Sequence, residues 1–217
     1  MTSAAVARRE RGRQEMREAI LVAARRILAD EGVDALSMRA VARAIGYSPA
    51  ALYEYFTAKE DLEDSLYFEG AGGLEGRLQT TLASLPPSAT AAEALTALGH
   101  AYRAFAREQP ELFRLIFFRR GSVAPPVRPP DGGSSGGFGS LINVVTRGVE
   151  NGEFVSVPTP VLALTAWSAV HGFVALELSG VLSGGPPGMP RGEDGSPSLD
   201  DVFAASLDLS VAGIRRR

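Results

Sequence analysis

Apolar residues recur at the spacing of helical turns along almost the whole chain. In residues 15–31 they fall three or four positions apart, with arginine and glutamate side chains on the opposite face. Two runs rich in proline, glycine and serine, residues 121–137 and 183–197, interrupt the pattern and are expected to form loops. The best candidate for a strand, residues 155–157, is too short to matter. The sequence therefore predicts an all-α fold.

The composition excludes several classes of protein. The 217 residues include no cysteine, which excludes a disulfide scaffold, a thiolate metal site and a cysteine nucleophile. No window approaches about 18 uninterrupted apolar residues, and the arginine-rich start lacks the apolar region of a secretory signal. We therefore expect a cytoplasmic protein without a membrane span, a metal or a cofactor.

The net charge of −3 is unevenly distributed. Residues 1–60 hold 10 basic and 8 acidic side chains, whereas the rest of the chain holds 12 basic and 17 acidic ones. A mildly basic N-terminal segment followed by an acidic remainder is typical of a small anion-binding module attached to a larger domain. Chance scatter of solvated charges explains the same numbers, and charge alone does not decide between the two.

Capping residues divide the first sixty residues into helices. Gly32 can supply the left-handed residue that ends the first helix, and Ser37 is a suitable N-cap for the second. Gly46 marks a tight turn, after which Ser48 and Pro49 are the N-cap and first residue of a third helix. Two short helices joined by a glycine-containing turn describe a helix-turn-helix. The three predicted helices span residues 15–31, 38–44 and 49–56.

The stretch from Leu36 to Leu62 resembles the N-terminal domain of TetR-family transcriptional repressors. The resemblance rests on three elements in register, Gly46-x-Ser48, Leu52-Tyr53-x-x-Phe56 and Lys59-Glu60-x-Leu62. This sequence departs from the family at Tyr55, where histidine is usual, and at Pro49-Ala50-Ala51, where many members place polar base-reading side chains. Because of these departures the sequence of the DNA operator cannot be predicted, whereas the fold still can.

The predicted DNA contacts come from this stretch. Free backbone N–H groups at the two serine-capped helix starts can hold phosphates, and tyrosine hydroxyls can reach phosphates or base edges. A lysine in the first turn of a helix is mildly disfavoured by the helix dipole, so we expect Lys59 to pair with an anion from outside. Alternatively, the tyrosines are packing residues and Lys59 is a surface charge. The candidates are Ser37, Arg39, Ser48, Pro49, Ala50, Ala51, Tyr53, Tyr55 and Lys59.

The segment before the first helix, residues 7–14, contains four arginines interrupted by Glu10. Basic arms of helix-turn-helix proteins can enter an adjacent minor groove. The segment is predicted either to act as such an arm or to be solvated.

Residues 61–217 are predicted to form a second, helical domain, so that the chain divides into residues 1–60 and 61–217. Within it, Trp167 with His171-Gly172 and the stretch 101–116 resemble one class of TetR-family C-terminal domains. Four glycines between residues 70 and 76 indicate close helix packing, a kink or a hinge. The predicted helices span residues 58–84, 89–107, 110–119, 138–151, 160–182 and 198–214.

The last two predicted helices are apolar on more than one face, which places them either centrally or at a subunit interface. The family resemblance implies a homodimer held by residues 160–182 and 198–214. Aromatic residues of the middle helices suggest a pocket for a mostly apolar small effector. His171 can face that ligand or be a hydrogen-bonded core residue. The candidate ligand-binding residues are Tyr102, Phe105, Phe113, Phe117, Trp167 and His171.

These features together predict a ligand-responsive repressor that binds double-stranded DNA at an inverted repeat and is released by its effector. No phosphate loop, nucleophile elbow or metal-spaced cluster indicates an enzyme, so no catalytic residue is predicted. A helical enzyme without a recognisable motif, and a helical interaction protein that does not bind DNA, remain the alternatives.

Overall fold

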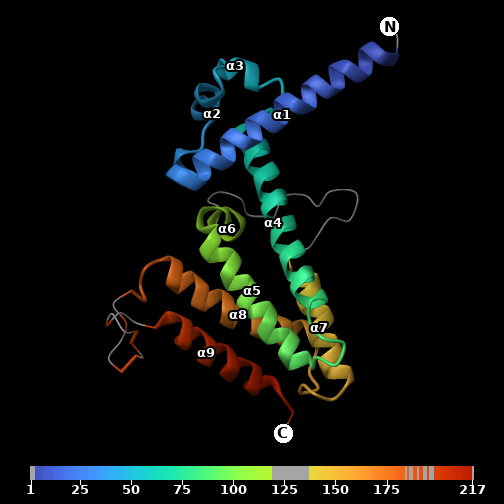
Figure 1. The fold of residues 1–217 in the computed structure, drawn as a ribbon, viewed down its shortest axis with the longest axis vertical. Helices are drawn as coiled ribbons and strands as arrows, with labels where there is room; N and C mark the ends of the chain where they lie inside the picture. The colour runs from blue at the N-terminus through green and yellow to red at the C-terminus, as the bar shows by residue number, and fades with distance from the viewer. Residues whose placement is uncertain are drawn as a thin grey trace. The chain divides into compact units, whose positions relative to one another are not determined.

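The computed structural model describes residues 3–118, 137–183 and 198–216, with a few positions between 185 and 195. These residues fold into α-helices joined by short turns (Figure 1). The helices are α1 (Ser3–Glu31), α2 (Met38–Ile45), α3 (Pro49–Leu52), α4 (Lys59–Ala83), α5 (Ala91–Glu108), α6 (Pro110–Phe117), α7 (Phe138–Glu150), α8 (Thr159–Leu178) and α9 (Leu199–Ile214), with a 3-10 turn, η1 (Val33–Ala35). Among the described residues an isolated bridge joins Phe154 to Arg215 and no strand is formed, so the predicted all-α fold is confirmed.

Three helix boundaries differ from the prediction by more than a turn, and one of them is the end of α8, at Leu178 instead of residue 182. α1 begins at Ser3 instead of residue 15, because alanine, arginine, glutamate and glutamine extend an existing helix without an apolar stripe. α3 ends at Leu52 instead of residue 56. The carbonyls of Glu54 and Tyr55 accept hydrogen bonds from arginines of α1, which replace the bonds of a longer helix.

The chain packs as two compact units. The first, called the head, contains Met1–Gly70 and the segment that begins at Gln109, which includes α6. Its core joins Ile20 of α1, Val41 of α2 and Leu52 of α3 with Phe56, and α6 contributes Leu115. The helix-turn-helix is therefore held by a core that includes a helix from far along the sequence.

The second unit, called the body, contains Ala71–Glu108 and the segment that ends at Arg217. Here α5 packs against α7, α8 and α9. The division between the units falls inside α4, after Gly70, where a Cβ atom would lie 2.8 Å from Leu112 Cδ1 of the head. Close packing therefore explains Gly70, whereas a Cβ at Gly72, Gly73 or Gly76 would have no neighbour within 4 Å.

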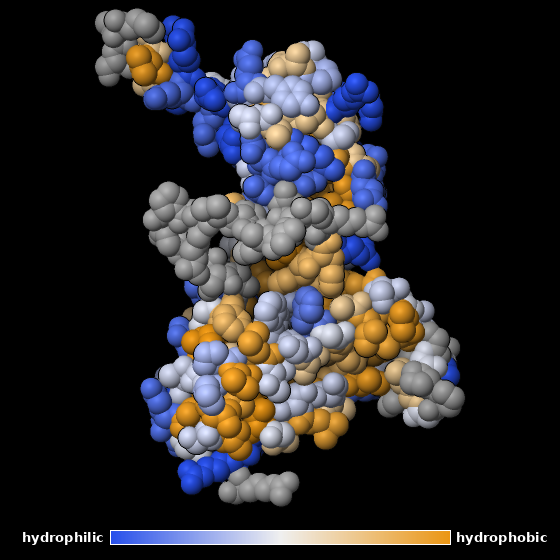
Figure 2. Space-filling model, turned by 180° about the vertical axis from the view of Figure 1, so that it is seen from behind, coloured by the Kyte–Doolittle hydropathy of each residue, from blue (hydrophilic) through white to orange (hydrophobic). Residues whose placement is uncertain are grey.

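The surfaces of the two units differ in hydropathy. The face seen in Figure 2 is mainly hydrophilic over the head and carries broad hydrophobic patches over the body. Among the described helices, α8 is long and apolar enough to cross a membrane by length and composition. Its buried side packs against α5, α7 and α9, and its Glu177 binds Arg103, as in a helix of a folded domain.

Candidate nucleic-acid interface and ligand site

Capping residues shape the helix-turn-helix as the sequence predicts. Ser37 Oγ accepts a hydrogen bond from the backbone N–H of Ala40 at 3.2 Å, and Ser48 Oγ accepts one from Ala51 at 3.3 Å. Gly46 has a φ of 75° and ends α2 in the left-handed conformation, which favours glycine. These caps set the turn between α2 and α3 from local sequence alone.

The two helices bury their apolar residues and expose the candidates. Leu52 and Phe56 are each 1% exposed, whereas Tyr53 is 52% exposed. Two further exposed side chains of this surface, Arg43 and Tyr47, were missed by the sequence analysis, although their places beside Gly46 could have indicated them. The exposed candidates are Arg39, Ser48, Pro49, Ala50 and Tyr53, while Ser37, Ala51, Tyr55 and Lys59 are half-buried.

Lys59 and Tyr55 each make contacts within the head. Lys59 Nζ lies 3.1 Å from Glu63 Oε1 one turn along α4, so this lysine has an internal partner, and its pairing with an anion from outside stays a prediction. The ion pair leaves other ammonium hydrogens that can still bind a phosphate. Tyr55 packs against the hydrophobic core of the head, which agrees with the alternative of a packing residue.

Two arginines of α1 attach the turn after α3 to the rest of the head. Arg17 donates to the carbonyl oxygen of Tyr55 at 2.9 Å and to Ser65 Oγ at 2.9 Å, and its guanidinium lies 4.1 Å from the Phe56 ring centre. Arg13 donates to the carbonyl oxygen of Glu54 at 3.2 Å. These contacts connect positions about forty residues apart, so local patterns could not reveal them.

The start of α4 is fixed by Asp61. Its carboxylate accepts hydrogen bonds from the hydroxyl and the backbone N–H of Thr57. The bond from the Thr57 hydroxyl is the main reason that the pKa of Asp61 lies below its usual value. The first turn of α4, with Lys59, is thereby held beside the helix-turn-helix.

In the body, three of the predicted ligand-binding residues lie together. Tyr102 Oη lies 2.7 Å from His171 Nδ1, and Trp167 Nε1 donates to Tyr102 Oη at 3.2 Å. The Trp167 and His171 ring centres lie 5.8 Å apart, and the Phe138 ring centre also lies 5.8 Å from that of Trp167. Burial lowers the pKa of His171 and raises that of Tyr102, which favours a neutral, hydrogen-bonded pair.

The other three candidates lie elsewhere. Phe105 is buried in α5, within the body. Phe113 and Phe117 belong to α6 in the head, where their ring centres lie 4.7 Å apart. The structure therefore joins Tyr102, Trp167 and His171 by direct contacts and assigns Phe113 and Phe117 to the other unit.

A charge network around the buried Arg103 in the body is not predicted from the sequence. Arg103 donates two hydrogen bonds to Glu177 of α8, at 2.7 and 2.8 Å, and lies 2.8 Å from Asp200 of α9. Its guanidinium also lies 4.7 Å from the Phe203 ring centre. The network connects α5, α8 and α9, and its hydrogen bonds and charges keep the pKa of Asp200 low. Arg103 is therefore a structural residue, not a free polar group.

A second buried acid has a different environment. Glu75 of α4 accepts hydrogen bonds from Ser140 Oγ at 2.6 Å and from Gln79 Nε2 at 2.8 Å, both on Oε1. Its Oε2 is buried and has no hydrogen-bond partner among the described residues. Glu75 thus differs from Glu177, whose charge is neutralised by Arg103.

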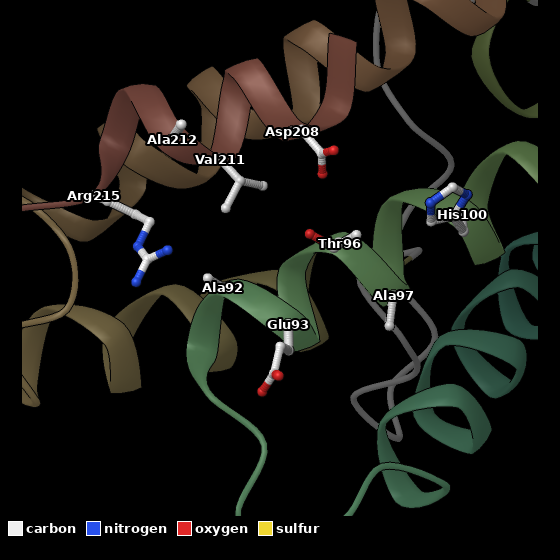
Figure 3. A pocket seen from close by; sticks show the side chains of 9 residues that line it. All are labelled: Ala92, Glu93, Thr96, Ala97, His100, Asp208, Val211, Ala212 and Arg215. Atoms are coloured by element: carbon white, nitrogen blue, oxygen red, sulfur yellow. The ribbon is translucent and has the colours of Figure 1, made fainter. Parts of the chain in front are cut away.

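A groove of about 530 Å³ lies between α5 and α9, where side chains of the two helices face each other (Figure 3). It contains none of the residues predicted to bind ligand, and His100 lies at one end of it. His100 also makes an edge contact with the Phe203 ring at 5.4 Å. The lining residues are Ala92, Glu93, Thr96, Ala97, His100, Asp208, Val211, Ala212 and Arg215.

Both α8 and α9 expose large apolar residues. Leu209 of α9 is 75% exposed, and Val161, Leu164 and Leu176 of α8 are about half exposed. The apolar pattern of residues 160–182 predicts Val174 to be an outward position of the dimer interface, but this prediction is wrong, because Val174 is fully buried within the body. In α8, apolar residues occur on both faces, and periodicity alone does not decide which face turns inward.

Across residues 3–118, 137–183 and 198–216, no group of three His, Cys, Asp or Glu side chains could hold a metal ion.

Comparisons with known proteins agree with the fold and with the helix-turn-helix. Residues 20–66 match the family described as bacterial regulatory proteins, tetR family, and residues 95–194 match the tetracyclin repressor-like C-terminal domain. The second match includes the Trp167 and His171 segment.

Similar proteins extend over nearly the whole chain. An uncharacterized HTH-type transcriptional regulator of Mycobacterium tuberculosis, Rv0681, is 28% identical over 93% of this chain and 82% of its own length. A Rhodococcus sp. RHA1 protein of unknown function has a TM-score of 0.73 and 26% identity, covering 92% of this chain and 95% of that one. FadR from Bacillus subtilis, solved with stearoyl-CoA, has the same fold, with a TM-score of 0.66, 21% identity and coverage of 91% and 98%. The chain belongs to the TetR family of transcriptional regulators, with a DNA-binding N-terminal domain and a ligand-binding C-terminal domain.

Proposed function

We propose that this regulator is a homodimeric repressor that binds an inverted repeat through α2, α3 and the start of α4 of both subunits. The observation that carries the proposal is the exposed surface around Ser48 and Tyr53, beside Lys59, above a fully apolar core. Tyrosine and lysine side chains at such a surface suit phosphate contacts, and Ala50 suits a thymine methyl group. A repressor of this kind acts on DNA in the cytoplasm.

The homodimer is proposed from the apolar surface of α8 and α9. A lone domain rarely exposes several large apolar residues on neighbouring helices, because covering them with a partner gains free energy. A second subunit presenting the same two helices would form a four-helix interface. Two-fold symmetry then places two recognition surfaces on paired half-sites of DNA.

The effector is proposed to be a mostly apolar small molecule bound in the body near Trp167. The aromatic cluster supplies apolar surface, and the Tyr102 and His171 groups supply orientation. The FadR structure holds stearoyl-CoA, so this fold can accommodate a ligand with a long apolar chain. That Phe113 and Phe117 of the head also bind ligand stays a prediction.

Release is proposed to follow a shift of α4, which passes from the body into the head. Exposed glycines at positions 72, 73 and 76 weaken this helix where the two units divide. By linkage, an effector that weakens DNA binding must bind free protein more tightly than DNA-bound protein by the same factor.

The deciding experiment selects genomic fragments that bind the purified protein and tests them by gel retardation. An inverted repeat retarded by a dimer, and released by an apolar compound that changes Trp167 fluorescence, would support every part of the proposal. Failure to enrich any sequence would favour an interaction protein without DNA binding. Unchanged effector affinity in both Trp167→Phe and Phe117→Ala would place the ligand elsewhere.

A further inference from the structure

The first turns of α1 form a helical extension without a core contact. Residues 8–15 are all exposed, and the first fully buried side chain of α1 is Ile20. Figure 1 shows these turns extending beyond the other helices of the head. Packing therefore does not explain why this segment is helical and rich in arginine.

Three arginines of α1 lie on the side of the helix that faces the rest of the head. Arg9, Arg13 and Arg17 are spaced four residues apart, which aligns them with the buried Ile20. Arg17 and Arg13 donate to the carbonyl oxygens of Tyr55 and Glu54, two consecutive residues of the turn after α3. The row of arginines therefore runs alongside the turn that follows α3.

Arg9 is the next member of this row and lies one turn before Arg13, about 6 Å towards the N-terminus of the helix. Its side chain is exposed and has no hydrogen bond or ion pair with any of the described residues. Arg11 belongs to the same exposed extension and is equally without such a partner, but its position is about 160° around the helix from Arg9. The two arginines therefore have equal charge and similar exposure on nearly opposite faces.

We infer that Arg9 binds a DNA phosphate next to those contacted by the turn after α3. In this row Arg13 and Arg17 bind protein carbonyl oxygens, and Arg9 binds the DNA backbone. A helix with its side chains is about 10–12 Å wide, whereas the minor groove is about 6 Å wide. The helical extension therefore follows the backbone and does not enter the minor groove as an extended arm would. The inference rests on the proposed DNA binding and adds a contact outside the helix-turn-helix.

The test measures operator affinity of the full-length protein over a range of salt concentrations, using a duplex of the selected operator with flanking sequence on both sides. Removing one phosphate contact lowers the slope of log K against log salt by about 0.9. We expect Arg9→Gln to lower the slope by this amount per subunit and to leave the order of preferred sequences unchanged. Arg11→Gln, the matched control, should retain the wild-type slope. Hydroxyl-radical footprints should lose protection at the flanking backbone only in Arg9→Gln.

Two outcomes would overturn the inference while the wild type still binds its operator. Equal slopes for Arg9→Gln and wild type would show that Arg9 contacts no phosphate. Equal decreases in Arg9→Gln and Arg11→Gln would indicate a diffuse charge effect of the whole extension. Failure of the wild type to bind any operator would instead contradict the proposed function, so the two failures are distinguishable.

Discussion

The head and the body specify their structures in different ways. In the head, Ser37, Gly46 and Ser48 define the turn through contacts to residues only a few positions away. In the body, hydrogen bonds that join different helices connect residues more than 60 positions apart, as in the Tyr102–His171 and Arg103–Glu177 pairs. Contacts between residues close in sequence can be predicted from one sequence, whereas contacts between distant residues become known only from the packed helices.

The outward surfaces of the two units differ as well. The head presents polar and small residues over an apolar core, which suits a hydrated partner such as DNA. The body exposes large apolar residues on α8 and α9, which suits a partner subunit. Substitutions that act on one surface and spare the other can test this difference.

The largest effect is expected from Val174→Asp, which places a charge inside the body. Burying an unpaired carboxylate should lower the free energy of unfolding by more than about 4 kcal/mol. Thermal unfolding followed by circular dichroism measures the loss. Val157→Asp, at a position that is 41% exposed, is the control and should unfold like the wild type. A stable, monomeric Val174→Asp protein would show that this side chain faces outward.

Leu209→Asp is expected to separate assembly from folding. Leu209 is 75% exposed, so a charge there should keep helicity intact and yield monomers without specific DNA binding. Light scattering and gel retardation measure the two properties. Val22→Asp introduces the same charge on α1, at a position that is 52% exposed, and should remain dimeric. A dimeric Leu209→Asp protein, or a monomeric wild type at micromolar concentration, would contradict the proposed interface.

Smaller effects are expected in the head from Tyr53→Phe and Lys59→Ala. Each removes a proposed phosphate contact and should weaken operator binding by about 1–3 kcal/mol. Lys59→Ala should also lower the salt slope by about one per subunit. Tyr67→Phe removes a hydroxyl from a tyrosine of α4 outside this surface and should bind as the wild type does. Wild-type affinity in both contact variants, with native helicity, would show that neither Tyr53 nor Lys59 contacts a phosphate.

The smallest effect concerns pH and the body. Burial lowers the pKa of His171, so between this value and the unfolded value of about 6.5 the unfolded chain binds a proton that the folded chain does not. Stability of the body should therefore be complete above about pH 6.5 and decrease as the pH falls below it. His171→Gln, which can still accept the Tyr102 hydrogen bond, should show a weaker decrease of melting temperature between about pH 8 and pH 5. The same decrease in both proteins would assign it to other groups.

Sequence alone determined the all-α class, the approximate bounds of most helices and the caps of the helix-turn-helix, because these depend on contacts within one or two turns. Tertiary structure decided that α3 ends at Leu52, because arginines of α1 bind the carbonyl oxygens of the turn that follows it. It also turned Val174 inward and paired Arg103 with Glu177. A helix that is apolar on two faces fits its own periodicity in either orientation, and only its neighbours select one.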